Sequence, residues 1–422
     1  MRSYLAKKVL PVIAVFGAAC GGAGSFSDDP VGLHPVVLCA TGSTADWRGW
    51  IGYYSPPLVS ASWAGIQREN QSWHTIDATE AKVFLNPGER IRLARWLPAM
   101  TPLGMPSAEI FFVTAEQAQT AFPCDSSSRK SLHGTVQGLE TGQGGYLSIG
   151  NSVRTFSNGP FTMEGVSPGM TDLVATRLDA PAKAILRHGV DYPNGSEISL
   201  LDFGSAEAVS LEPHTLAVND ANTTQFFGTS QIITQLGADG LLSIDVATTG
   251  SATRTVTTYS VPESSLTNDD VQFLTVDPQD YRYAMVFYRH PADRTVTLGP
   301  GATTATGTHL RTVLNRTLRL DMPSQPEYGA QVTFFLCTGS GSYYRAATLL
   351  VTKEYFGGTP ATWSVIVPDL ASVQGFPGGD LRASNLCSVQ SLTNLPFVFA
   401  PRTTHEGDTF TFLTYGINVT NK

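Results

Sequence analysis

The sequence predicts an all-β protein in which about four β-sandwich modules follow one another along the chain. The first reason is the length of 422 residues, which is more than one compact core usually holds. The second is composition: 40 Gly and 26 Pro accompany only 15% charged residues, which is typical of strands and turns. The third is that short β-branched and aromatic runs recur at the spacing of sandwich strands.

The clearest strand signals are apolar runs that are rich in β-branched and aromatic residues and bounded by turn-forming residues. They cover residues 34–39, 91–97, 110–114, 282–289, 331–337 and 409–414. One helix is expected over residues 114–122, because Thr114 and Gln117 have capping-box spacing and Pro123 ends the segment. Hairpin turns are expected at positions such as Asp239-Gly240.

The N-terminus has the parts of a secretory signal. Residues 1–19 begin with a basic stretch, continue with an apolar run and end on Gly17, Ala18 and Ala19, directly before Cys20. The apolar run is far shorter than the roughly 20 residues that a membrane-spanning helix needs. We therefore expect a cleaved signal peptide rather than a transmembrane helix.

This segment resembles the lipobox of bacterial lipoproteins, in which the cysteine after the cleavage site receives the lipid. The resemblance implies that Cys20 is the lipidated N-terminus and that residues 20–30, which contain a Gly-rich stretch, form a tether. It also implies a protein held at the outer membrane or the cell surface, since several acyl chains give stable anchoring. The alternative is an ordinary secreted protein that is cleaved near Ala19.

Four further cysteines follow the predicted signal, and an oxidising compartment favours disulfides. Two lie towards each end of the chain, so pairing within each end keeps each bridge inside one module. We expect Cys39–Cys124 and Cys337–Cys387, each stabilising its module by about 4 kcal/mol. Four cysteines allow three pairings, and buried free thiols are the alternative.

Polar and Gly-rich stretches divide the exported chain into four modules. The boundaries fall at residues 125–130, at Gly204-Ser205 and at residues 299–307. The expected modules are an aromatic-rich β module with one short helix over 31–124 and sandwiches over 131–204, 206–298 and 308–422.

The second module has a distinctive order of motifs. Gly134-Thr135-Val136 opens a strand, residues 161–166 form a short strand from Phe to Val, and Pro168-Gly169 leads into another strand. This order is similar to the carboxypeptidase regulatory-like, prealbumin-like β-sandwich. The resemblance implies an accessory module without catalysis of its own, and we expect immunoglobulin-like or prealbumin-like sandwiches throughout.

No sequence motif for an enzyme or a cofactor is present. The eight histidines show neither His-x-His nor His-Glu-x-x-His spacing, and Gly-x-Ser-x-Gly and Gly-rich phosphate loops are missing. We expect no metal, no cofactor and no catalysis, with calcium at Asp269-Asp270 as a weaker alternative to a polar turn. A hydrolase whose residues meet only in the fold stays open. The net charge of −8 argues against nucleic-acid binding.

Tryptophan is distributed unevenly, since five of the six fall in the first module. Flat rings with polar rims stack on sugars and dominate partner surfaces. Alternation places Trp96 on the face of Arg92 and opposite Leu93, so we expect Trp96 to be exposed. The candidate ligand-binding residues are Trp96, Arg92, Trp47, Trp50 and Trp73. The alternative is that these rings fill the core.

Taken together, these features predict a membrane-anchored exported lipoprotein with a structural or binding role at the bacterial cell envelope. The alternative is a carbohydrate-binding or adhesive surface protein that uses the aromatic first module. Its expected partners are the membrane, through the lipid anchor, and a glycan or an envelope protein.

Overall fold

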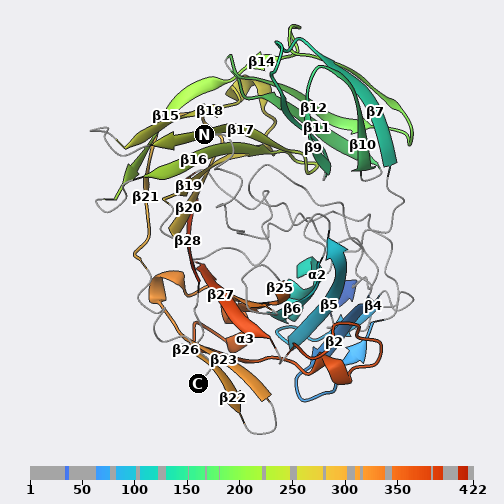
Figure 1. Ribbon diagram of the computed structural model, residues 1–422, viewed down its shortest axis with the longest axis vertical. Coiled ribbons are helices and arrows are strands. Elements are labelled where there is room, and N and C mark those ends of the chain that lie inside the picture. Colours follow the sequence, from blue (N-terminus) through green and yellow to red (C-terminus); the bar gives the residue numbers. More distant parts are fainter. Residues whose placement is uncertain are drawn as a thin grey trace.

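Strands dominate the protein, and they form several separate sheets (Figure 1). The all-β prediction is therefore confirmed, and the sheets are consistent with tandem sandwiches. The computed structural model describes residues 34–37, 63–76, 82–100, 105–121, 130–150, 152–166, 169–179, 181–220, 225–247, 254–278, 282–301, 309–313, 317–337, 345–381, 384–392 and 407–416. The predicted signal peptide, Cys20, the tether, Cys39 and Cys124 lie outside these ranges.

The strands that the sequence signals most clearly are all present. They are β1 (His34–Val37), β5 (Arg90–Met100), β6 (Met105–Thr114), β20 (Arg282–Tyr288), β24 (Gln331–Cys337) and β28 (Thr409–Gly416). The predicted helix is α2 (Ala115–Ala121). Its capping interaction is also present, because the backbone N–H of Thr114 donates to Gln117 Oε1 at 3.1 Å.

The second module is a sandwich of two facing sheets around one apolar core. One sheet has the order β10 (Gly159–Val166), β7 (Lys130–Gln137) and β13 (Glu197–Asp202). The other has the order β14 (Val209–Ser210), β12 (Lys183–Asp191), β11 (Met170–Arg177), β8 (Gly145–Ile149) and β9 (Ser152–Phe156). Leu132, Leu173 and Phe203 lie in the core between them. The sandwich runs past the predicted boundary at Gly204-Ser205, because β14 pairs with β12.

The third module places a small sheet over part of a large one. The small sheet has the order β18 (Thr255–Ser260), β15 (Glu212–Asn219) and β21 (Arg294–Thr297). It covers β17 (Asp239–Ala247), β16 (Phe226–Ile233), β19 (Val271–Asp277) and β20, with Leu216, Phe226 and Tyr288 in the core between the layers.

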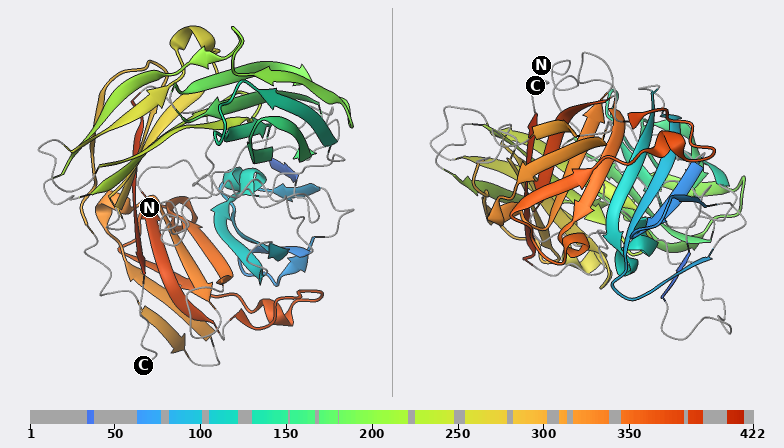
Figure 2. Two further views of the ribbon diagram at one scale, coloured as in Figure 1. Left: turned by 45° about the horizontal axis from the view of Figure 1, so that its top comes forward. Right: turned by 90° about the horizontal axis from the view of Figure 1, so that it is seen from below.

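The first and fourth predicted modules share one sheet and one core. β6 pairs in parallel with β25 (Arg345–Thr352), and Figure 2 shows their strands side by side. Trp63, Phe112, Phe334 and Trp363 belong to the same apolar cluster. The predicted division into 31–124 and 308–422 therefore does not mark two separate cores. The two predicted modules are not separate because both faces of β6 are buried. Phe112 on one face belongs to this cluster, and Phe111 on the other face belongs to a second cluster.

The strands around β6 complete this part of the molecule. β2 (Trp63–Arg68), β3 (His74–Thr75) and β5 continue the sheet on one side of β6, and β25, β24, β27 (Asn385–Leu392) and β28 continue it on the other. A covering sheet holds β22 (His309–Val313), β23 (Thr317–Pro323) and β26 (Thr362–Ile366), while β1 pairs with β4 (Lys82–Leu85) in a separate sheet. Two short elements, α3 (Lys353–Phe356) and η5 (Leu370–Ser372), follow β25 and β26.

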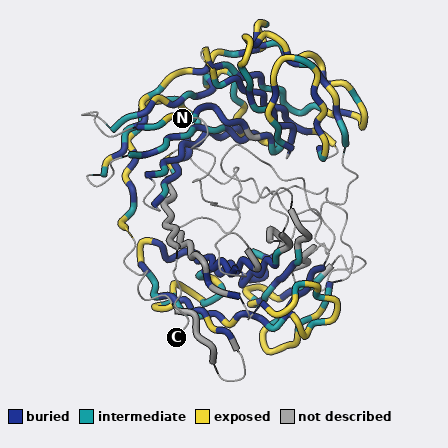
Figure 3. Tube along the Cα trace, viewed as in Figure 1, coloured by how far each residue is buried: buried dark blue, intermediate teal, exposed yellow. Residues whose placement is uncertain are grey.

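A single twelve-stranded sheet connects the third module to this shared unit. β20 pairs with β28, with Met285 opposite Phe410, so the order runs from β17 through β20 and β28 to β6 and β3. Figure 3 shows buried residues along those strands of this sheet whose burial is described, such as β16, β19 and β24. No helix in the described part of the chain is long and apolar enough to cross a membrane.

The cysteine predictions fall partly within the described residues. Cys337 is 3% exposed at the end of β24 and is disulfide-bonded. Cys387 lies on the neighbouring strand β27, next to Leu386, which faces Leu336. Pairing of Cys337 with Cys387 stays a prediction, for which non-reducing peptide mapping is the test, and the same holds for Cys39 with Cys124.

Candidate functional site

A groove opens between the end of the large sheet and the segment that follows β26. Its volume is about 630 Å³. One wall carries Trp73, His74 and Arg92 from the first predicted module, and the other carries Asp369 and Gln374 from the fourth. The two walls of the groove therefore come from opposite ends of the chain.

A tight turn places Trp73 and His74 at the rim of the groove. Asn70 occupies the left-handed region with a φ of 60°, which Asn tolerates better than most residues. The side-chain amide of Gln67 donates to the carbonyl of Gln71 at 2.9 Å and closes the turn. The short strand β3 then pairs with β2, with Ile66 opposite His74.

Arg92 is held in place by polar and aromatic neighbours. Its Nε donates to the hydroxyl of Tyr355 at 3.1 Å, and its Nη1 donates to Gln67 Oε1 at 2.9 Å. Its guanidinium lies 5.3 Å from the centroid of the Phe112 ring, which adds a cation–π contact. The groove thus has a positioned planar cation in its wall.

Two hydrogen bonds tie the opposite wall to the sheet. The carbonyl of Gln374 accepts from Trp63 Nε1 at 3.3 Å and from Thr75 Oγ1 at 3.1 Å. Trp73 is partly buried against the apolar cluster beneath, while Ile366 at the edge of the groove is 49% exposed. The site combines an aromatic ring, apolar contacts and several polar groups in one open groove.

The structure places two of the five predicted ligand-binding residues, Trp73 and Arg92, in this groove. Trp96 lies elsewhere: it is partly buried and packs edge-on against Phe376 at 5.4 Å. Trp96 is therefore only partly exposed, because the segment containing Phe376 packs against that face of β5. Trp47 and Trp50 lie outside the described residues. No local signal marks Gln374 or Asp369, which lie far from Trp73 along the chain.

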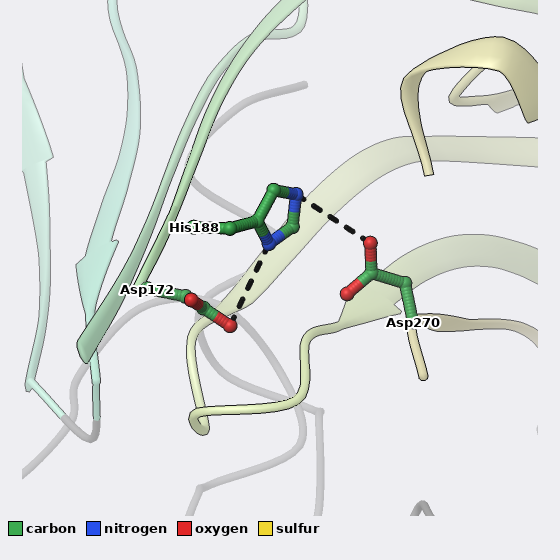
Figure 4. Close-up of side chains that lie close together, drawn as sticks. All are labelled: Asp172, His188 and Asp270. Atoms are coloured by element: carbon green, nitrogen blue, oxygen red, sulfur yellow. Dashed lines mark ion pairs between the residues drawn. The ribbon is translucent and has the colours of Figure 1, made fainter. Parts of the chain in front are cut away.

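A second cluster of side chains lies where the second module meets the third (Figure 4). Asp172 comes from β11, His188 from β12, and Asp270 directly precedes β19. His188 Nδ1 lies 3.7 Å from Asp172 Oδ2, and His188 Nε2 lies 3.6 Å from Asp270 Oδ2. The exposed fractions of the side chains are 1% for Asp172, 0% for Asp270 and 29% for His188.

A β-bulge positions the first two of these residues. The register between β11 and β12 shifts between Thr171 and Leu173, which leaves Asp172 beside His188 and Gly189. The backbone N–H of Gly189 donates to Asp172 Oδ1 at 2.7 Å. From the third module, the backbone N–H of Leu236 donates to Asp172 Oδ2 at 2.8 Å.

The environment shifts the pKa of all three groups. Burial alone would raise the pKa of Asp172, but the contact with His188 and the backbone N–H donors of Leu236 and Gly189 outweigh it and hold the pKa at about 2. The contact with Asp172 raises the pKa of His188 against the effect of burial, and the charge of Asp270 adds to it. Burial raises the pKa of Asp270, although the N–H of Thr267 partly opposes it.

Comparison with known proteins gives one weak structural similarity to report. No protein-family model matches it, and no curated protein matches it. Among solved structures it is weakly similar to the Bacillus anthracis TIE protein, with 10% identity and a TM-score of 0.14 over 94% of this chain and 74% of that one. A similarity of this size supports no statement about function.

Proposed function

We propose that this protein is an exported, lipid-anchored binding protein of the bacterial cell envelope, and that its groove takes a carbohydrate. The observation that carries the proposal is the meeting of Trp73 and Arg92 in one groove. Export and anchoring are supported by the N-terminal sequence that resembles a lipobox before Cys20.

The composition of the groove suits a sugar better than a purely apolar ligand. A tryptophan ring offers a flat face for the C–H groups of a sugar ring, while Arg92, Gln67 and Asp369 offer donors and acceptors for hydroxyl groups. A volume of about 630 Å³ lies within the range of small-molecule sites, which suits a short saccharide. The open shape also allows a longer chain to extend beyond the groove.

Binding to polysaccharides and glycan arrays tests the groove. Trp73→Ala is expected to weaken binding by roughly 5- to 150-fold, which corresponds to about 1 to 3 kcal/mol for a hot-spot aromatic ring. Gln374→Ala provides a second variant, because its exposed side chain lines the groove whereas only its backbone carbonyl ties the wall to the sheet. Leu200→Ala is the matched control, since Leu200 is 43% exposed and lies on the second module. Retained glycan binding in both groove variants would rule out this site.

Membrane fractionation tests the anchor independently of the groove. Cys20→Ser should release the protein from membranes into the soluble fraction, because the residue that receives the lipid is lost. Wild-type protein in the soluble fraction would show that the lipoprotein assignment is wrong, and it would leave the groove proposal unaffected.

A further inference from the structure

We infer that Asp172, His188 and Asp270 bind one divalent metal ion of the zinc type between the second and third modules. One ligand atom from each residue can be chosen so that all three lie within 4.8 Å of one another. One imidazole and two carboxylates are a donor set that Zn²⁺ accepts in proteins. The site does not depend on the proposed carbohydrate groove.

The spacing of the three groups allows one such ion after a small movement of side chains. With metal–ligand distances of about 2.0 to 2.2 Å in tetrahedral geometry, two ligand atoms on one ion lie about 3.3 to 3.6 Å apart. Because the three ligand atoms already lie within 4.8 Å of one another, the widest pair needs to close by at most about 1.5 Å. The side chain of His188 is 29% exposed although its ring nitrogens are shielded, so the cluster lies close to the protein surface.

Unpartnered polar atoms point to a ligand at this place. Asp270 is fully buried, and its Oδ1 has no hydrogen-bond partner. Both ring nitrogens of His188 are shielded from solvent and also have no hydrogen-bond partner. Buried polar atoms without partners are rare in proteins, because each carries an uncompensated loss of hydration. An ion held by one ring nitrogen of His188 and by the two carboxylates would supply part of these missing interactions, because an imidazole binds one ion through one nitrogen.

The charges of the cluster also fit a divalent cation. Among the described residues, the ion pairs of Asp172 and Asp270 are those with His188. With a neutral imidazole the cluster carries two negative charges in a buried place, and one divalent ion compensates both. The adjacent cation Arg187 does not serve this purpose, because its Nε and Nη2 bind Glu207.

Neighbouring backbone groups already orient the carboxylates. Asp172 accepts from Gly189 and Leu236, and Asp270 Oδ2 accepts from the N–H of Thr267 at 2.7 Å. Contacts of this kind fix the direction of metal ligands in proteins. Because the ligands come from two modules that also share the apolar cluster of Val174, Ala184 and Ile232, the bound ion would join them.

The test is titration of the full chain, treated with a chelator, with Zn²⁺ in a calorimeter and in a thermal unfolding assay. The wild type should bind one ion and melt at a higher temperature when Zn²⁺ is present, since a ligand of the folded state stabilises it. Asp270→Asn should weaken Zn²⁺ binding by more than about 100-fold, because loss of an outer partner alone costs about 10- to 100-fold. His188→Gln is the second variant, chosen because its side chain is partly exposed and its folding is less at risk.

Two matched controls separate this site from surface binding. Asp269→Asn changes the exposed neighbour of Asp270, and His290→Gln changes a histidine that is 65% exposed. Both should bind Zn²⁺ like the wild type. The proposal is wrong if the wild type shows no stoichiometric binding, or if His188→Gln binds as tightly as the wild type. If His188→Gln lowers the stability and the wild type binds no Zn²⁺, the three side chains form an Asp–His–Asp ion network that depends on the protonation of His188, and the metal proposal is wrong.

Discussion

Arg95 Nε lies 2.6 Å from Glu109 Oε2, and only 3% of each side chain is exposed. The two residues face each other in the register of β5 and β6, and the guanidinium also lies 5.7 Å from the centroid of the Phe111 ring. Removing two charges from water is costly, so a buried pair contributes little net stability by itself. Removing one partner is more damaging, because the other charge stays buried and loses this short contact.

Glu109→Gln should therefore lower the free energy of unfolding by about 3 to 5 kcal/mol. Urea unfolding measures the change, with exposed Glu69→Gln as the control. The double variant Arg95→Met with Glu109→Leu should recover most of the loss, because it removes both charges and keeps apolar volume. Equal unfolding midpoints for Glu109→Gln and the wild type would contradict this account.

Trp96→Ala should lower the free energy of unfolding by about 1 to 3 kcal/mol, less than the 3 to 5 kcal/mol of a fully buried ring. The reason is the edge-on contact with Phe376, whose ring also meets Trp63 at 5.0 Å. Thermal unfolding of Trp96→Ala and Phe376→Ala checks this, and the double variant should cost less than the sum of the two. A melting temperature unchanged by Trp96→Ala would mean that this ring contributes no packing energy.

A pH-dependent contribution to stability is expected from Glu207. Its carboxylate accepts from Arg187 Nε at 2.6 Å and from Arg187 Nη2 at 2.9 Å, and this interaction lowers the pKa of Glu207. A lowered pKa in the folded state means that the stabilisation is complete above the unfolded pKa of about 4.3 and is lost as the pH falls through the folded pKa. The carboxylate side chain is 39% exposed, so the effect should stay below about 1 kcal/mol.

Comparison of Glu207→Gln with the wild type at pH 7 and at pH 3 measures this contribution. The variant should unfold at a lower urea concentration at pH 7, and the difference should shrink at pH 3. A difference that grows towards pH 3 would have the wrong sign for a carboxylate with a lowered pKa.

The strands could be predicted from the sequence because their signals are local. Residues 331–337 and 409–414 are rich in β-branched and aromatic residues and are bounded by turn-forming residues, whatever their neighbours are. Their pairing could not be predicted, since β20 meets β28 and β6 meets β25 over long separations in the chain. The turn expected at Asp239-Gly240 also failed, because β17 begins at Asp239 and the chain turns just before it.

The candidate sites also contain residues that the sequence could predict and residues that it could not. Trp73 and Arg92 could be selected by residue type, because aromatic rings and guanidinium groups are common in binding sites. The opposite wall with Gln374 comes from the other end of the chain, and no local signal marks it. Asp172 and His188 meet through the pairing of β11 with β12, and Asp270 joins them only where the second module touches the third.

Gly240 is expected to be intolerant of any side chain, because it lies against the second module. A Cβ atom there would lie 2.4 Å from Val174 Cγ1 and 3.1 Å from Ile232 Cγ2. Both of these side chains are fully buried in the apolar cluster between the modules, so they have little room to move. Gly240→Ala should lower the free energy of unfolding by about 1 to 3 kcal/mol, as overpacking does.

Urea unfolding of Gly240→Ala measures this effect, and Gly301→Ala is the control because a Cβ at Gly301 meets nothing within 4 Å. Adding Val174→Ala to Gly240→Ala should recover part of the loss, since it removes the closest atom, although Val174→Ala alone should be destabilising through the cavity that it leaves. Val174→Ala would destabilise the wild type but stabilise the Gly240→Ala variant only if residues 174 and 240 are in contact. If Val174→Ala costs the same in both backgrounds, Gly240 does not pack against Val174 and the contact between the second and third modules differs from the one described.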